Sequence, residues 1–516
     1  MISDNREALQ KLAVQTLQYC MNQLQMGEDG LLRYVDAIDG EEISAHYGAT
    51  HVATAFIVFG LSNDDTDIYK KGIDALKSVL ERWNVIQSLP AFHFDFNNFA
   101  LCVAYENLSN QEEQLKELIK TVVLQTADSN HDTINWLPMR WYVNYMRLQW
   151  TGNEQYKKIC NRCFTSIRNA TNRDGSIEDR LPRGRSYNLQ YNIATVGCLQ
   201  FLRNRGIDYP LGDELGFLLQ SVLPDGDINY QGRGTNQIFA WSMWLYLLST
   251  SGNSDALTVA LHYLENRIPN MLAHHNLMLN DFKGEEKFLW WDYHYSSVYI
   301  AHLLFWVVMA LNDHNGKSIR PNMVSHQVQN LQITRNDNCA IAVFGGREEY
   351  LSEQGPVVSA IWTRRHGMLM KGVFGPYKGS FGNRYIYEHI VLQNFCGLLQ
   401  IKMPRDLSSN RYFRKLLPKR GRPAPQIQIT PLFIPISVVD LNECLHIRFS
   451  SVSVVSGLFN LPLLTETSET DISLEVDGEK VALSAASKIR TQYDWCTLLQ
   501  SKVLHGCVWD LKIKLS

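Results

Sequence analysis

Two kinds of helical sequence pattern alternate six times between residue 2 and about residue 312, and this repeat restricts the chain to very few architectures. The first kind is amphipathic, as in DDTDIYKKGIDALKSVLERW, and the second is almost continuously apolar. The amphipathic segments span 3–25, 66–84, 111–126, 154–171, 211–222 and 254–270. A period of about 40 to 50 residues built from helical hairpins is typical of a solenoid or of a closed ring.

Each apolar segment opens with a cluster of polar and aromatic residues. The openings lie at His46, His93, Asn135, Ser186, Gly232 and Trp290. Apolar inner helices that alternate with amphipathic outer helices favour the closed ring, so we expect an (α/α)6 toroid over residues 1–315. Because the inner helices of such a ring run in one direction, these clusters should meet at one mouth.

The helical period ends at about residue 311, in a stretch with many turn residues, so we expect a linker at 316–335. Residues 336–516 contain runs rich in β-branched and aromatic residues, separated by short Gly, Asp or Asn turns. The pentapeptide VDGEK (476–480) is a good signal for a two-residue hairpin. The expected fold class is therefore α+β and multidomain, with a helical toroid followed by an antiparallel β-sandwich.

The charge balance limits the partners of this chain. A formal net charge of −3 gives no general attraction to nucleic acid or to anionic membranes, so a polyanion would need a local cationic patch. The longest apolar run, 298–311, is shorter than a membrane span, and the N-terminus lacks the pattern of a signal peptide. We therefore expect a cytoplasmic protein without a membrane span, while export by another route or a removed leader stays open.

The ten cysteines do not form a metal-binding pattern. Only Cys160 and Cys163 approach the required spacing, and no second pair completes a tetrahedral site. His46 and His51 are five residues apart, which differs from the HExxH motif of zinc proteases. We expect reduced thiols, no metal and no cofactor.

Aromatic residues gather at the helix openings that should face the mouth. They are Trp136, Trp141, Tyr142, Tyr187, Tyr191, Trp290, Trp291, Tyr293 and Tyr295. Any single aromatic residue is more often a core residue, because aromatic side chains dominate burial. Their joint placement beside His, Asn, Asp and Arg favours a carbohydrate site, in which sugar rings stack on aromatic faces.

The stretch DGSIEDRLPRGRSYNLQYNIATVG (174–197) combines cations with two tyrosines. Tyr187 and Tyr191 are four residues apart and so share a helix face. Arg183 and Arg185 precede them, and nearby cations lower the free energy of forming a phenolate, so a tyrosine here is a candidate base. The alternatives are an ordinary core pair of tyrosines and a solvated arginine loop.

Asn135 and Arg233 stand at two other openings. Asn135 precedes Trp136 at a helix start, where it is either an N-cap or an amide donor to a substrate carboxylate. Arg233 lies between Gly232 and Gly234, where it could clamp a carboxylate bidentately or remain a loop charge. Both residues are candidates for neutralising an acidic sugar.

Histidines and carboxylates add further candidates. His46, His93 and His294 lie among the mouth motifs, although a lone histidine is more often structural. Asp95 and Asp292 could supply the paired carboxylates of a hydrolase, but their separation does not follow from the sequence. The residues expected to bind substrate are Arg183, Arg185, Trp136, Trp141, His46, Asp95, Trp291 and Tyr293.

The order NW (135–136), then DGS followed by two tyrosines, then a Gly-flanked arginine resembles polysaccharide lyases, both hyaluronate and chondroitin lyases and heparinase II/III-like enzymes. The resemblance extends to the layout of a toroid followed by a β-sandwich. It implies that Asn135 neutralises a uronate carboxylate and that Tyr191, or Tyr187 in its place, is the catalytic acid or base. It also implies help from Arg233 and a histidine. Hyaluronate-type lyases carry a histidine nine residues before the catalytic tyrosine, and Pro182 occupies that position here.

The expected function is cleavage of a uronic-acid-containing polysaccharide by β-elimination, with an anionic polysaccharide or oligosaccharide as the partner. Three alternatives stay open: a uronate C5-epimerase, a glycoside hydrolase that uses Asp95, Asp292 or Glu178, and a non-catalytic polysaccharide-binding protein. The uronic acid, the linkage, endo or exo action and the oligomeric state do not follow from the sequence.

Overall fold

The computed structural model covers most of the helical half of the chain and the principal strands of the second half. The described residues are 2–38, 40–89, 92–130, 133–181, 184–186, 188–231, 234–276, 279, 296–314, 316–322, 331–344, 357–371, 436–438, 444–457, 460–465, 471–490, 495–502 and 504–515. Among them, no helix has both the length and the apolar character that crossing a bilayer requires.

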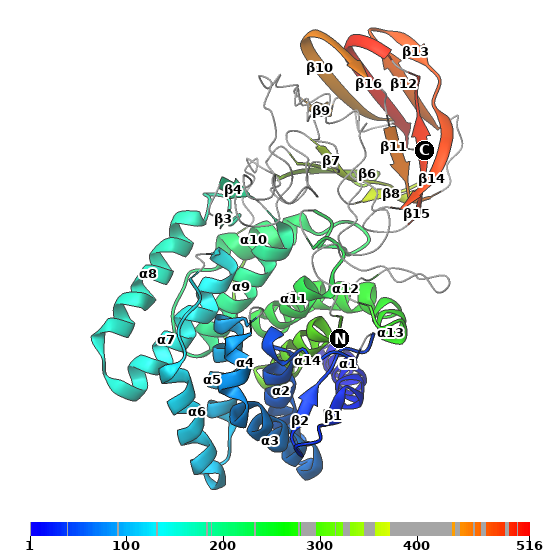
Figure 1. Cartoon of the computed structure of the whole chain (residues 1–516). Helices are drawn as coiled ribbons and strands as arrows, with labels where there is room; N and C mark the ends of the chain where they lie inside the picture. The colour runs from blue at the N-terminus through cyan, green and yellow to red at the C-terminus, as the bar shows by residue number, and fades with distance from the viewer. Residues whose placement is uncertain are drawn as a thin grey trace, which may run out of the picture. The chain divides into compact units, whose positions relative to one another are not determined.

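The chain divides into two compact units, the helical one drawn in blue to green in Figure 1. Unit 1 comprises Met1–Arg185, Gln190–Val222 and Asn236–Ser325, and unit 2 comprises Ser186–Leu189, Leu223–Thr235 and His326–Ser516. The main division lies between Ser325 and His326. Two short segments of the helical half, 186–189 and 223–235, belong to unit 2, and helical periodicity alone does not predict this.

The amphipathic repeats form outer helices at the expected places. They are α1 (Ile2–Asn22), α3 (Thr66–Glu81), α6 (Glu113–Gln125), α8 (Glu154–Ala170), α10 (Gly212–Ser221) and α12 (Ser254–Leu264), with the shorter α4 (Trp83–Ser88) and α13 (Arg267–Ala273) beside them. Local chemistry sets their starts: the carboxylate of Asp65 caps α3, and the amide oxygen of Asn153 caps α8. Four of them pack on an inner helix that adjoins them in the chain, α3 on α2, α6 on α5, α8 on α7 and α12 on α11.

The apolar repeats form the inner helices. They are α2 (Gly48–Ser62), α5 (Phe94–Asn107), α7 (Leu137–Thr151), α9 (Leu189–Asn204), α11 (Ile238–Ser251) and α14 (Ser296–Asn312). Helix α2 packs against both α5 and α14, α5 packs against α7, and α11 packs against α14. Ring contacts of Phe201 on α9 with Tyr142 on α7 and with Tyr246 on α11 complete the circuit. These contacts close the ring that the repeat predicts.

Aromatic side chains fill the middle of the ring. Phe99 lies with its ring centroid 5.0 Å from that of Phe201 and 5.8 Å from that of Trp306. All three side chains are buried. Because large rings from three non-adjacent inner helices, α5, α9 and α14, meet here, the interior of the ring is a packed core, and a ligand site has to lie at its end.

A tight turn holds the DGS segment against helix α10. The side chain of Asp174 accepts hydrogen bonds from the backbone N–H and the hydroxyl of Ser176, and Gly175 has a φ of +86°. A Cβ at Gly175 would lie 2.1 Å from the carbonyl oxygen of Asp213, at the start of α10. Glycine is therefore required at this position for two reasons, its left-handed backbone conformation and its lack of a side chain.

We expect Gly175→Ala to lower the free energy of unfolding by about 2–5 kcal/mol, the sum of left-handed strain and overpacking. Gly206→Ala is the matched control, because Gly206 has a φ of +83° but nothing lies within 4 Å of its added Cβ. The control should lose only the strain, about 1–2 kcal/mol. Urea unfolding measures both values, and equal losses would contradict the close packing of the turn on α10.

The described strands of unit 2 form antiparallel sheets. A four-stranded sheet contains, in order, β5 (Leu331–Arg335), β6 (Cys339–Phe344), β7 (Val357–Thr363) and β8 (Gly367–Lys371). A five-stranded sheet contains β13 (Glu479–Val481), β12 (Ile472–Val476), β16 (Leu504–Lys514), β10 (Cys444–Gly457) and β9 (Ile436–Val438). A three-stranded sheet contains β11 (Asn460–Leu463), β15 (Trp495–Gln500) and β14 (Ser484–Arg490).

One hydrophobic core joins these sheets. Ile361, Trp509 and Leu461, from the four-, five- and three-stranded sheets respectively, belong to the same buried cluster. The VDGEK segment forms the expected hairpin between β12 and β13, since Asp477 and Gly478 both have positive φ. The antiparallel β character is confirmed. The expected two-sheet sandwich is not confirmed, since the strands that the structure describes in unit 2 fall into three sheets.

Candidate functional site

Three of the residues singled out in the sequence meet at the starts of consecutive inner helices. His46 ends a short 3-10 helix, η1 (Ser44–His46), just before α2, His93 is the N-cap of α5, and Trp136 is the N-cap of α7. The ring centroids of His46 and His93 are 5.3 Å apart, and those of His93 and Trp136 are 6.0 Å apart. All three side chains are half-buried. The helix starts thus converge on one site, as the ring topology requires.

Tyr47 and Phe96 complete this site, although sequence analysis did not select them. The ring of Tyr47 stacks on that of Phe96 at 4.4 Å and meets the ring of His93 edge-on at 5.3 Å. Tyr47 has a φ of +65°, which is unusual for a residue other than glycine. We call His46, Tyr47, His93, Phe96 and Trp136 the mouth cluster. The only available signal for Tyr47 was its place between a histidine and a glycine at a helix start.

Two further histidines lie fully buried behind the mouth cluster. The ring centroids of His51 on α2 and His302 on α14 are 5.4 Å apart, and the ring of Phe239 stacks on His302 at 4.5 Å. Burial lowers the pKa of His51 to about 3. Burial, with a smaller contribution from His51, also lowers the pKa of His302. Both imidazoles are therefore neutral in the folded protein at physiological pH.

Acid is expected to destabilise unit 1 through this buried pair. In the unfolded chain both histidines take up a proton near pH 6.5, whereas the folded protein does not bind it until His51 nears its pKa of about 3. The unfolding free energy is therefore unaffected by these histidines above about pH 6.5. It falls as the pH drops toward 3, by about 2 kcal/mol per histidine at pH 5, because only the unfolded chain binds the protons. In His302→Phe, the loss of unfolding free energy between about pH 7 and pH 5 should shrink by about 2 kcal/mol. Urea titrations at both values test this, and an unchanged loss would show that His302 is not kept neutral.

Asn135 lies beside the mouth cluster in the short 3-10 helix η3 (Ile134–Trp136). Its side chain is buried, and its Oδ1 has no hydrogen-bond partner among the residues that the structure describes. Trp136, and not Asn135, is the N-cap residue of α7, and the side chain of Trp136 makes no cap hydrogen bond. As placed, the Oδ1 of Asn135 is an acceptor for a donor such as a sugar hydroxyl, and turning the amide over by 180° presents its N–H group at the same point instead.

Tyr191 lies in the first turn of α9 and is half-buried. Its backbone carbonyl accepts a hydrogen bond from the hydroxyl of Thr195 at 2.8 Å. Helix α9 is the neighbour of α7 in the ring, so Tyr191 and Trp136 stand at the starts of adjacent inner helices. This placement is compatible with a shared site at the mouth.

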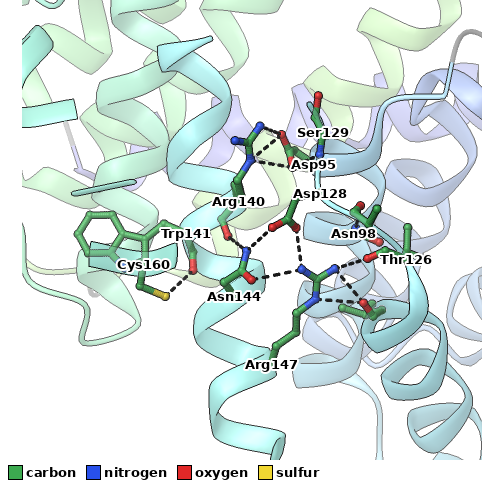
Figure 2. Close-up of polar contacts among 12 residues, drawn as sticks. Asp95, Asn98, Thr126, Asp128, Ser129, Arg140, Trp141, Asn144, Arg147 and Cys160 are labelled. Carbon is green, nitrogen blue, oxygen red and sulfur yellow. Dashed lines mark hydrogen bonds and ion pairs between the residues drawn. The ribbon is translucent and has the colours of Figure 1, made fainter. Parts of the chain in front are cut away.

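The structure assigns Asp95 a different role from the expected one. Asp95 is 1% exposed and forms an ion pair with Arg140 of α7, with 2.9 Å between Oδ2 and Nη2 (Figure 2). The backbone N–H of Ser129 also donates to its Oδ1. Burial raises the pKa of the Asp95 carboxyl, and the ion pair with Arg140 opposes this rise. In this structure the Asp95 oxygens therefore bind α7 and the α6–α7 loop, an arrangement that favours a structural role over the expected contact with substrate.

A second ion pair continues this network along the same face of α7. Arg147 binds Asp128 with 2.6 Å between Nη1 and Oδ1, and Asn144 donates to the other oxygen of Asp128 at 3.0 Å (Figure 2). Arg147 also donates to the backbone carbonyls of Val123 and Thr126. The network therefore fixes the end of α6 and the loop that leads toward Asn135.

Trp141 is also a packing residue. Its ring lies against Phe164 of the outer helix α8 and against Tyr209, at centroid distances of 5.7 Å and 6.4 Å. The side chain is 8% exposed. These contacts join the inner and outer layers, which replaces the expected role of Trp141 in binding substrate.

Two buried carboxylates follow the DGS turn (174–176) in the chain. Glu178 and Asp179 are 5% and 3% exposed. Asp179 begins the short strand β3 (Asp179–Leu181), which contacts η3 and pairs with β4 (Gly184–Ser186). The backbone of β3 therefore runs beside η3, the 3-10 helix that carries Asn135. Glu178 is a hydrolase candidate from the sequence, whereas Asp179 was not selected there.

Several expected site residues fall outside the described part of the chain. These are Arg183, Tyr187, Arg233, Trp291, Tyr293 and His294. Arg185 is described only as a backbone residue of β4. Among the described residues, no group of three or more His, Cys, Asp or Glu side chains is arranged to hold a metal ion.

Comparison with known proteins shows weak structural likeness only. No protein family and no curated protein matches the sequence. The α-1,6-mannanase GH76A of Salegentibacter sp. HEL1_6 has a TM-score of 0.41 at 11% identity, over 59% of this chain and 99% of that one. An unsaturated glucuronyl hydrolase of Streptococcus agalactiae has a TM-score of 0.37 at 12% identity, over 60% of this chain and 92% of that one. These likenesses are too weak to carry an inference about function.

Proposed function

We propose that unit 1 cleaves a uronic-acid-containing polysaccharide by β-elimination at the mouth cluster. The observation that carries the proposal is the convergence of His46, His93 and Trp136 at the starts of three consecutive inner helices, with Asn135 beside them. An imidazole pair next to an indole face combines proton transfer with a surface on which a sugar ring stacks. The amide of Asn135 adds a neutral hydrogen-bonding group for the sugar carboxylate.

The proposed reaction assigns each group a step. The amide N–H of Asn135 donates to the C6 carboxylate of the uronic acid, which stabilises the negative charge that develops when the C5 proton leaves. A neutral imidazole of His93 or His46, or the Tyr191 phenolate, takes the C5 proton. The electrons of the broken C–H bond form the C4–C5 double bond while the C4–O bond breaks. A second of these groups, in its protonated form, gives its proton to the leaving oxygen.

A glycoside hydrolase is the second candidate, and one observation favours it. Strand β3, which begins at Asp179, contacts η3, so the backbone that carries Asp179 lies near Asn135 and Trp136, and Glu178 directly precedes it. Hydrolysis needs such a pair, one as general acid and one as base or nucleophile. Asp95, the carboxylate on α5, is not available for this role because it is paired with Arg140.

The fate of water oxygen separates the two reactions. Hydrolysis places one oxygen atom from water at the new reducing end, whereas elimination places none there. The protein should be incubated with uronate polysaccharides in heavy-oxygen water and the products analysed by mass spectrometry. The proposal predicts products without the heavy oxygen and with a mass lower by one water than hydrolysis would give. A product mass higher by one water molecule, with heavy oxygen incorporated before the reducing-end hemiacetal exchanges its own oxygen with water, would assign the site to the hydrolase.

A further inference from the structure

We propose that His46 and His93 form a binding site for one divalent transition-metal ion of the kind that prefers imidazole, such as Zn²⁺, with water at its remaining positions. The two rings come from the starts of α2 and α5, so their spacing along the chain does not resemble a metal motif. The site is a property of the fold and not of a local sequence pattern.

The distance between the rings suits a shared ion. The ring centroids of His46 and His93 are 5.3 Å apart and their planes are inclined by 41°. Two imidazoles that bind one tetrahedral ion, each at a nitrogen–metal distance of about 2.0–2.1 Å, have centroids roughly 5 Å apart. Both side chains are half-buried, so an ion can reach them while most of their rotamer freedom is already lost.

A buried hydrogen-bond bridge fixes this spacing from behind. The hydroxyl of Thr50 on α2 lies 2.8 Å from Oδ1 of Asn97 on α5, and the amide of Asn97 donates to the backbone carbonyl of His93 at 3.1 Å. The same hydroxyl lies 3.0 Å from the carbonyl of Tyr47, the residue that follows His46. Thr50 and Asn97 are at most 1% exposed. The bridge therefore connects the backbone next to one imidazole with the backbone that carries the other.

His51 strengthens the same arrangement. Its Nδ1 lies 2.9 Å from the carbonyl oxygen of Tyr47, which places the imidazole proton on Nδ1 as the donor. This bond holds the strained, left-handed backbone of Tyr47, and with it the end of η1 that carries His46. Hydrogen bonds behind metal-binding side chains orient them, and their loss commonly weakens metal binding by about 10- to 100-fold.

Isothermal titration of the whole chain with Zn²⁺ at neutral pH tests the site. Wild type should bind one more Zn²⁺ than either His46→Gln or His93→Gln, and Mg²⁺, which prefers oxygen ligands, should not compete. Acidification should weaken binding, because protons compete for the imidazole nitrogens. Equal stoichiometry in wild type and both variants, or no binding to wild type, would overturn the proposal.

A matched pair of threonine variants tests the bridge. Thr50→Val removes the hydroxyl that joins the two helices, and we expect Zn²⁺ affinity to fall by about 10- to 100-fold, with recovery in Thr50→Ser. Thr54→Val makes the same change one helical turn further along α2, where the hydroxyl contacts the carbonyls of Thr50 and Ala100. Thr54→Val should keep the wild-type affinity. Similar affinities in Thr50→Val and Thr54→Val would show that the bridge does not position the pair.

Bound Zn²⁺ would occupy both imidazoles and so inhibit turnover, and a chelator would restore it. This consequence rests on the proposed function, whereas the titration does not. If Zn²⁺ binds through His46 and His93 but the protein cleaves no polysaccharide, only the proposed function fails. If cleavage occurs and Zn²⁺ neither binds at this pair nor inhibits, only the metal site fails.

Discussion

Replacing Arg140 with methionine is expected to lower the free energy of unfolding of unit 1 by about 3–5 kcal/mol. Arg140 and Asp95 are 2% and 1% exposed, and the guanidinium is the cationic partner of the Asp95 carboxylate in their ion pair. Without it, Asp95 would either keep an uncompensated buried charge or take up a proton in the folded state. Chemical denaturation monitored by circular dichroism, at a pH near 7, measures the loss.

Two controls make this result specific. Arg33→Met removes the solvent-exposed ion pairs with Asp29 and Glu42 and should leave the unfolding free energy close to that of wild type, because water and salt screen such pairs. Combining Arg140→Met with Asp95→Leu removes both charges. Because an apolar pair leaves no buried charge without a partner, much of the lost unfolding free energy should be recovered. If the double variant loses as much unfolding free energy as Arg140→Met and Asp95→Leu lose together, the claim that the buried charge causes the effect would be contradicted.

The variant His93→Gln is expected to lower kcat/KM for polysaccharide cleavage by about 100- to 10,000-fold, the usual contribution of a general acid or base. His93 stands between His46 and Trp136 in the mouth cluster, so it is the imidazole closest to both other groups. Glutamine keeps a hydrogen-bonding side chain of similar reach but cannot transfer a proton. The rate should be measured on the polysaccharide that wild type cleaves fastest.

His275→Gln is the matched control for this experiment. His275 contacts Tyr19, with 5.7 Å between ring centroids, and does not belong to the mouth cluster. Its replacement should leave kcat/KM within about twofold of wild type. A His93→Gln variant that retains wild-type activity and stability would remove His93 from the chemistry.

The ring of helices was predictable because the signals that build it are local. Burial of one stripe, as on α3, or of the whole surface, as on α11, follows from residues within the helix itself. The order of inner and outer helices then follows from their alternation. The meeting of His46 and His93 at one mouth follows in turn from the closed ring.

What could not be predicted depends on pairs of residues far apart in the chain. Arg140 and Asp95 are separated by 45 residues, and only the packing of α5 against α7 turns a candidate catalytic carboxylate into a buried ion pair. The left-handed backbone of Tyr47 is likewise a tertiary effect, since the carbonyl of Tyr47 is held by His51. The assignment of 223–235 to unit 2 depends partly on Lys371 of β8, which forms ion pairs with Asp225 and Asp227.

The central claim is elimination at the mouth cluster, and ultraviolet absorbance tests it most directly. Conjugated unsaturated uronates absorb where the intact polysaccharides do not, so wild type and His93→Gln should be incubated with a panel of uronate-containing polysaccharides and followed over time. The account predicts a steady rise with wild type on at least one substrate and a rise at least about 100-fold slower with His93→Gln. New reducing ends without any rise in absorbance would contradict elimination and assign the mouth to hydrolysis.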